Sequence, residues 1–202
     1  MSDDGVVNQG RRRVLTAMTS VVGAAGAVGV AVPFVGSWNP SAKAKAAGAP
    51  VEFNFSKLEP GQMVTVEWRG KPVYVVRRTP EAIAGLKVAE DALGDPNSES
   101  AKQPVYITGG SRSIEGHEEI VVLLGLCTHL GCAPSYQPKV GSVDIAASDA
   151  EWQGGFLCNC HGSIFDLAGR VFKGVPAPTN LEIPPYKFVS DSVILIGVDQ
   201  EA

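Results

Sequence analysis

Two short clusters of cysteine and histidine hold the residues of this sequence that are best suited to chemistry. The clusters span residues 127–132 (CTHLGC) and 158–163 (CNCHGS), and together they contain all four cysteines and two of the three histidines. Each cluster offers thiolate and imidazole, so the pair can supply four ligands of mixed softness to one metal centre. One cysteine per cluster then remains to form a disulfide, but spacing alone leaves open which cysteines bind and which pair.

Zinc is the simplest occupant of such a set, because two cysteines and two histidines close a tetrahedral structural site. The Cys-x-His spacing of the first cluster differs from zinc-finger patterns, and zinc leaves the additional cysteine pair unexplained. The alternative is a [2Fe–2S] cluster with two thiolates on one iron and two imidazoles on the other, which has a raised reduction potential. Gly131, Gly155 and Gly162 are expected to let the loop backbone approach sulfide and donate N–H bonds to it.

The paired motifs resemble those of the Rieske iron–sulfur proteins, and the whole chain resembles the Rieske subunit of a bacterial cytochrome bc complex (ubiquinol–cytochrome c reductase). The resemblance runs from Arg11 to the C-terminus, and it includes residues 174–181 (GVPAPTNL), which are similar to the family's proline loop over the cluster. It implies one [2Fe–2S] cluster per subunit.

The resemblance also assigns roles to individual residues. It implies that Cys127 and Cys158 bind the inner iron and that Cys132 and Cys160 form the disulfide between the loops. It further implies that His129 and His161 bind the outer iron and that His161 bonds the quinol hydroxyl. Leu130 is implied to lie beside His161 at the docking tip, and Ser163 to hydrogen-bond a sulfide.

Two positions depart from the pattern of many family members. Asn159 stands where a proline is common, which predicts a less rigid loop without removing a ligand. Phe165 stands where a tyrosine commonly donates a hydrogen bond to a ligand sulfur. Because a donor to sulfur stabilises the reduced state, its absence predicts a lower potential than in tyrosine-bearing relatives. The resemblance implies ubiquinol as the quinone, and because menaquinol systems work at lower potential, the predicted lower potential keeps menaquinol as an alternative.

The N-terminal region predicts a membrane anchor. Residues 14–35 contain no charged side chain, and such a run is long enough to cross a hydrocarbon core of ~30 Å. Three arginines precede it, which predicts a cytoplasmic tail over residues 1–13 and a twin-arginine export signal. Residues 14–36 are expected to be a retained single-pass anchor, with a cleaved signal peptide or a buried helix as alternatives. The alanine-rich residues 37–50 are expected to be a flexible hinge.

From residue 51 the pattern becomes that of strands. Alternating apolar residues predict a strand at 51–55 and a hairpin of 63–68 with 73–77, and Thr79-Pro80 predicts a short helix start. Apolar runs at 119–126 and 154–157 are expected to deliver Cys127 and Cys158, and a last strand is expected at 188–198. The expected fold is all-β: a Rieske domain over 51–202, with an antiparallel sandwich base and an inserted cluster-binding subdomain at about 126–178, on one N-terminal transmembrane helix.

Other function classes find little support. A net charge of −4 and dispersed basic residues exclude a nucleic-acid groove. The sequence contains no nucleophile–base pair, phosphate loop or dinucleotide fingerprint, which argues against hydrolases and transferases. His117 has no cysteine or histidine neighbour and is expected to be an exposed loop residue without function.

The resemblance implies a redox subunit, active only within its complex, that oxidises ubiquinol at the periplasmic face of the bacterial inner membrane with coupled proton release. The implied partners are cytochrome b and a membrane c-type cytochrome, which receives the electron, in a dimeric complex. Two alternatives remain: the Rieske subunit of another exported oxidase such as arsenite oxidase, and a zinc-stabilised interaction module without a redox role.

Overall fold

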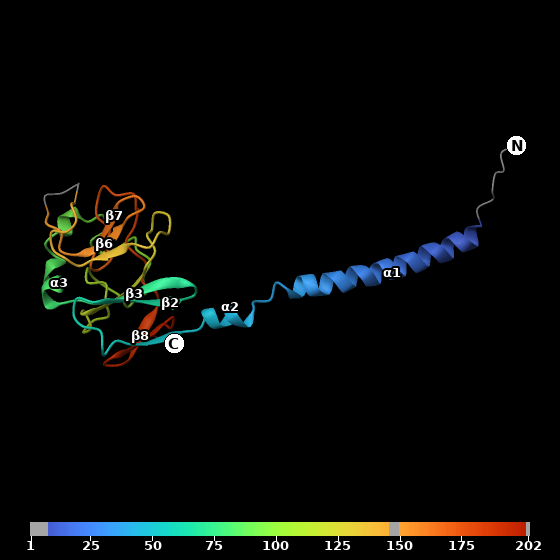
Figure 1. Ribbon diagram of the computed structural model, residues 1–202, viewed down its shortest axis with the longest axis horizontal. Helices are drawn as coiled ribbons and strands as arrows, with labels where there is room; N and C mark the ends of the chain where they lie inside the picture. Colours follow the sequence, from blue (N-terminus) through green and yellow to red (C-terminus); the bar gives the residue numbers. More distant parts are fainter. Residues whose placement is uncertain (1–7, 146–149, 201–202) are drawn as a thin grey trace. The chain divides into compact units, whose positions relative to one another are not determined.

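The computed structural model describes residues 8–145 and 150–200. Residues 1–7 of the predicted cytoplasmic tail and residues 146–149 of the predicted cluster-binding subdomain lie outside the described residues. The chain divides into two compact units, one ending at Ala46 and one beginning at Ala47. Figure 1 shows a long helix in the first unit and a sheet-rich domain in the second.

The first unit is dominated by helix α1, Gln9–Gly36, whose 28 residues correspond to about 42 Å. It begins before the predicted anchor, because Asn8 caps it by accepting a hydrogen bond from the Arg11 N–H at 3.1 Å. The three arginines therefore lie inside the helix. Its described side chains are all exposed, and its length and composition suffice to cross a membrane.

A second helix occupies part of the predicted hinge. Helix α2, Ala42–Ala47, is built from alanine and lysine, which are strong helix formers. The Ser41 hydroxyl accepts a hydrogen bond from the Ala44 N–H at 3.1 Å. The hinge, residues 37–50, therefore contains one helical segment between irregular ends.

The base of the second unit consists of two antiparallel sheets. One sheet has the order β1-β9-β8 and the other β2-β3-β4. Their strands are β1 Val51–Asn54, β2 Met63–Trp68, β3 Lys71–Arg77, β4 Ile120–Leu124, β8 Tyr186–Ser190 and β9 Val193–Ile196. Arg69 and Gly70 both have positive φ, 53° and 70°, as the type I′ turn of a tight hairpin requires. The two-sheet base agrees with the predicted sandwich.

The prediction of one final strand at 188–198 was wrong. The segment folds back at Asp191 and Ser192, so that β8 and β9 pair as a hairpin with a register shift between Phe188 and Ser190. Asp191 and Ser192 are short polar residues, which favour turns, and they interrupt the apolar run between the two strands. The predicted helix start is confirmed: α3, Pro80–Gly85, is capped by Thr79, whose hydroxyl accepts from the Ala82 N–H at 3.1 Å.

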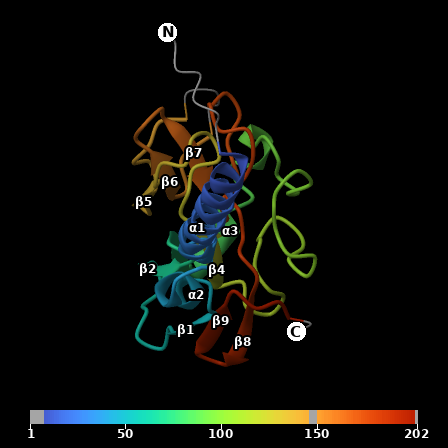
Figure 2. The same ribbon diagram turned by 90° about the vertical axis from the view of Figure 1, so that its right-hand side faces the viewer.

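A third sheet is inserted between β4 and β8 in the sequence. Its order is β5-β6-β7, with β5 Ser135–Gln137, β6 Gly155–Cys158 and β7 Ser163–Asp166. Figures 1 and 2 both show this sheet at one end of the domain, with β2–β4 between it and β8–β9. The predicted inserted subdomain is thus observed as a separate sheet. Of three buried hydrophobic clusters among the described residues, the largest, to which β3 and β4 contribute heavily, continues up to Cys127 and Cys158.

Candidate metal centre

Each cysteine–histidine loop follows a buried strand. β4 is buried along its whole length and leads to Cys127, whereas β6 ends at Cys158 itself. Gly131 and Gly162 have φ of 81° and 74°, a left-handed conformation that glycine adopts without strain. These turns bring the chain back so that each loop is compact.

The N–H groups of Gly131 and Gly162 are used within their own loops, and the expectation that other N–H groups of the loop backbone donate to sulfide stays a prediction. The Gly131 N–H donates to the Cys127 carbonyl and the Gly162 N–H to the Cys158 carbonyl, both at 2.9 Å. Gly155 has another role, because a Cβ there would lie 2.8 Å from the Asp166 Cα. It therefore permits the close pairing of β6 with β7.

A disulfide joins the two loops between Cys132 and Cys160, residues 28 apart in sequence. The Sγ atoms of these two residues and of Cys158 lie within 4.8 Å of one another. Sulfurs that share a covalent bond offer no thiolate to a metal, so this trio is not a ligand set. Cys127 and Cys158 remain as free thiols, 3% and 2% exposed, and the structure thereby resolves what spacing left open about the pairing.

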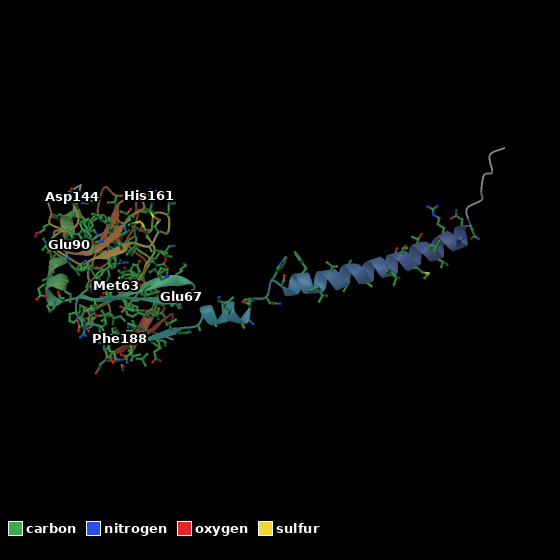
Figure 3. All side chains as sticks on the ribbon, viewed as in Figure 1. Met63, Glu67, Glu90, Asp144, His161 and Phe188 are labelled. Carbon is green, nitrogen blue, oxygen red and sulfur yellow. A yellow bond between two sulfur atoms is a disulfide. The ribbon has the colours of Figure 1, made fainter. Side chains whose placement is uncertain are left out.

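The two histidines lie side by side at the end of the domain. The ring centroids of His129 and His161 are 4.9 Å apart and the rings are nearly perpendicular. His129 is half-buried, and its Nδ1 is buried without a hydrogen-bond partner among the described residues. Buried polar atoms almost always have a partner, so this nitrogen fits a metal ligand. His161 is exposed, and Figure 3 shows sulfur atoms close to it.

Burial raises the pKa of one inner thiol. Desolvation raises the pKa of Cys127, and the neighbouring Cys158 raises it further, against the main-chain N–H of His129 and the Ser163 hydroxyl. The Cys127 thiol is therefore neutral without a metal, and binding a metal must release its proton. With two thiols and two imidazoles, this donor set fits a [2Fe–2S] cluster bound through two thiolates and two histidines.

The proline loop, residues 174–181, is tied to both ligand loops. The Ala177 N–H donates to the Ser163 hydroxyl oxygen at 3.0 Å, and the Thr128 hydroxyl donates to the Thr179 carbonyl at 2.6 Å. Ser163 is fully buried, and its own hydroxyl proton stays available for a sulfur. Sequence reasoning missed Thr128, although its position between Cys127 and His129 was a usable signal.

Leu130 and His161 are both exposed at the loop tips, Leu130 at 71%. Asn159, predicted to leave its loop less rigid, donates from Nδ2 to the Ser135 hydroxyl at 3.2 Å. This bond ties the second loop to β5, and a proline could not make it. Phe165 is fully buried opposite Phe156 in β7 and β6, where it offers no hydrogen-bond donor.

Two further residues, Tyr74 near the site and His117 outside it, differ from what the sequence predicted. Tyr74, which sequence reasoning missed, donates its hydroxyl to the Pro134 carbonyl at 2.8 Å, and burial together with Cys158 raises its pKa. His117 is half-buried and stacks on Phe188, with ring centroids 3.9 Å apart. The expectation of a plainly exposed histidine was therefore wrong, although His117 does lie outside the metal centre.

A β-rich domain with two disulfide-bridged cysteine–histidine loops defines a Rieske-type iron–sulfur protein. The family model described as "Rieske [2Fe-2S] domain" matches residues 50–187, and one described as "Ubiquitinol-cytochrome C reductase Fe-S subunit TAT signal" matches residues 1–41. The cofactor of this domain is accordingly a [2Fe–2S] cluster and not zinc.

Curated relatives show which group of Rieske-type proteins this chain resembles. The ubiquinol-cytochrome c reductase iron-sulfur subunit of Allochromatium vinosum is 56% identical over 200 residues, covering 99% of this chain and 94% of that protein. The same-named subunit of Blastochloris viridis is 41% identical and covers 98% of each. A chain of a hyperthermophilic respiratory Complex III is 26% identical with a TM-score of 0.47, covering 88% of this chain and 98% of its own. This chain belongs to the family of ubiquinol–cytochrome c reductase iron–sulfur subunits.

Proposed function

We propose that this chain takes electrons from ubiquinol and passes them to a c-type cytochrome within a quinol–cytochrome c reductase. The observation that carries the proposal is the polarity of the site: two buried thiols lie behind an exposed imidazole at His161. A substrate that docks on the tip reaches that imidazole without entering the domain. The names of the relatives favour a quinol substrate over the alternative, a subunit of another exported oxidase such as arsenite oxidase.

The residues at the tip divide the work. Cys127, Cys158, His129 and His161 hold the [2Fe–2S] cluster, which supplies a one-electron acceptor whose potential is raised by its neutral imidazole ligands. The ring nitrogen of His161 that does not bind iron bonds the quinol hydroxyl and takes its proton. Leu130, 71% exposed, excludes water from the docked face. The hydroxyl of Ser163 donates to a sulfur.

The N-terminal unit supports a location for this chain, and the names of its relatives support its partners. We infer that α1 is a retained anchor in the bacterial inner membrane and that the β-rich unit works in the periplasm. The match to a twin-arginine signal model over residues 1–41 supports export of a folded protein. Cytochrome b provides the quinol site, a membrane c-type cytochrome receives the electron, and the complex is a dimer.

Low-temperature EPR of the purified full-length protein, before and after ascorbate, tests the redox centre. A rhombic signal that appears with ascorbate supports a high-potential cluster with histidine ligands and thus quinol oxidation. A signal seen only with dithionite would point to a low-potential centre with another electron donor. No signal together with stoichiometric zinc would overturn the electron-transfer role.

A further inference from the structure

Arg112 is a fully buried cation that serves as a link between backbone segments. Its Nη1 donates to the carbonyls of Ala168 and Gly169 at 2.9 and 3.1 Å, and its Nη2 to the carbonyl of Leu181 at 2.6 Å. Its Nε donates to Gln103 Oε1 at 3.1 Å. No salt bridge to Arg112 occurs among the described residues. The guanidinium is held by neutral oxygens from three separate parts of the chain.

Burial lowers the pKa of Arg112 to about 10, against the attraction of Asp166 and Asp95. The side chain therefore keeps its proton at neutral pH. A buried charge is costly unless it is well hydrogen-bonded, and the planar fork of arginine reaches several acceptors that lysine cannot reach together. The backbone at Arg112 is left-handed, with φ 53°, and this conformation costs a non-glycine residue free energy. Both features indicate that the fork is required at this position.

The two segments that Arg112 joins also meet at the metal centre. Gly169 lies in the turn after β7, the strand that begins at Ser163, whereas Leu181 ends the proline loop. The Leu181 N–H donates to the Gly169 carbonyl at 2.8 Å, so both peptide groups of Leu181 are fixed. At the other end, the Ala177 N–H donates to the Ser163 hydroxyl oxygen. Loop and strand are thus fastened at both ends, and Arg112 fastens the end remote from the ligands.

We propose that Arg112 is a positioning residue that holds the proline loop against β7 and thereby orients the Ser163 hydroxyl toward the cysteine sulfur. The Ala177 N–H occupies a lone pair of the Ser163 oxygen, which directs the hydroxyl proton elsewhere, and the Cys127 thiol is its neighbour. Hydrogen bonds to ligand sulfur set the reduction potential of iron–sulfur centres. Loss of the Arg112 fork frees the loop, lets the hydroxyl rotate and lowers the potential. This inference deepens the proposed function and rests on it for the readout of potential.

Hydrogen exchange of the cluster-loaded, full-length protein gives a readout that is independent of electron transfer. In Arg112→Lys and Arg112→Met we expect amide exchange across residues 174–181 to accelerate by about tenfold or more, as the loss of a charged hydrogen bond to a buried carbonyl would produce. Amides of the β2–β3 hairpin should keep their rates. The midpoint potential, measured by EPR-monitored titration, should shift downward in both variants.

Arg77→Met is the matched control, because the Arg77 guanidinium also donates to a backbone carbonyl, that of Leu58, at 2.9 Å. It should leave both the loop exchange and the potential unchanged. Wild-type exchange rates and potential in Arg112→Lys, combined with changes of both in Arg112→Met, would show that the positive charge, and not the hydrogen-bonding fork of the guanidinium, holds the loop. That result would refute the positioning role of the fork. Uniformly faster exchange over the whole domain would equally refute it.

Gln103→Leu keeps the test decisive if the Arg112 variants do not fold. It removes the acceptor of the Nε bond together with the hydrogen bond from the Gln103 amide to the Ile107 carbonyl, and it leaves the three carbonyl bonds of Arg112 in place. We expect the same pattern at smaller amplitude, and unchanged loop exchange in this variant would overturn the proposal. Failure of the proposed function is recognised separately by EPR. A protein that gives no EPR signal with ascorbate would contradict the proposed function, whereas the hydrogen-exchange pattern of the Arg112 variants would still test the positioning role.

Discussion

At the scale of single residues, solvent exposure increases across the site from the cysteines to the outer histidine. The thiols of Cys127 and Cys158 are almost completely buried, His129 is half-buried, and His161 is exposed. Charge on the buried side is expensive, whereas the exposed imidazole can exchange protons with a substrate. This gradient supports the proposal that the outer histidine contacts the substrate, while the inner cysteines belong to the buried core.

Phe165→Tyr should raise the midpoint potential. The Phe165 side chain is fully buried in the same core as Cys127 and Cys158, so an added hydroxyl can donate to a ligand sulfur and stabilise the reduced state. Redox titration monitored by EPR measures the shift, and Phe165→Leu serves as a control that adds no donor. An unchanged midpoint in Phe165→Tyr would refute the prediction that Phe165 lowers the potential.

Gly125→Ala should destabilise the domain by about 1–3 kcal/mol, the usual cost of overpacking. A Cβ at Gly125 would lie 2.5 Å from the ring of Tyr74, and that ring cannot move freely because its hydroxyl bonds Pro134 and its face stacks on Phe156. Thermal unfolding measures the effect. Gly94→Ala, where the new Cβ would make an ordinary contact of 3.4 Å with Val171, should unfold near the wild-type temperature; equal losses in both variants would contradict the packing argument.

At the scale of elements, two strand ends and one disulfide build the site. β4 and β6 deliver the loops, and the Cys132–Cys160 bond fixes one loop to the other. The proline loop closes over both through Thr128 and Ser163. Each loop is thus held by its strand, by its neighbour and by a third segment.

Replacing Cys132 and Cys160 together by alanine should lower the free energy of unfolding by about 3 kcal/mol. A disulfide that spans 28 residues restrains the unfolded chain by an amount of that order. Denaturant titration of the cluster-loaded protein gives the number, and the rate of bleaching of its visible absorbance should rise as the loops separate. Wild-type protein treated with a reductant should behave like the double variant, and a double variant as stable as the untreated wild type would exclude a stabilising role.

The sequence predicted elements where a local pattern was strong. Alternation identified the β2–β3 hairpin, and Thr79-Pro80 identified the start of α3. β5 and β7 were not predicted, because strands of three and four residues are too short for a periodic signal and depend on their pairing with β6. The final hairpin was read as one strand because its two apolar halves hid a two-residue turn.

The start of α1 and the helix in the hinge were not predicted from the sequence. Absence of charge defined the anchor, yet a helix continues through arginines when a cap such as Asn8 is available. At the site, spacing found the candidate residues but left their pairing open, because pairing depends on how strands from separate segments pack. The observed disulfide supplied the pairing, and the Nδ1 of His129, which has no hydrogen-bond partner within the part of the chain that the structure describes, supported a role as a ligand.

At the scale of the whole molecule, a membrane-type helix and a β-rich domain are joined through residues 37–50. α2 occupies residues 42–47 of this connection. If the domain moves between a quinol site and a cytochrome, the connection has to change shape during each turnover.

Ala44→Pro combined with Ala46→Pro should therefore slow quinol–cytochrome c turnover several-fold, because proline removes helix hydrogen bonds and restricts the backbone. The midpoint potential should not change, since the cluster site lies in the other unit. Steady-state turnover of the assembled complex and an EPR titration measure the two quantities. The serine pair Ala44→Ser and Ala46→Ser is the control, and wild-type turnover in the proline variant would rule out the hinge.

The two ligand loops follow different strands, β4 and β6, and neither loop alone contains the complete set of ligands. The metal centre is therefore complete only when the strands have brought both loops together. If the cluster is inserted before export, the domain must cross the membrane already folded, which agrees with the match to a twin-arginine signal model. The disulfide forms in oxidising surroundings, so its redox state reports whether the protein has been exported. Free thiols at Cys132 and Cys160 would mark protein before export, and the closed disulfide would mark protein after it.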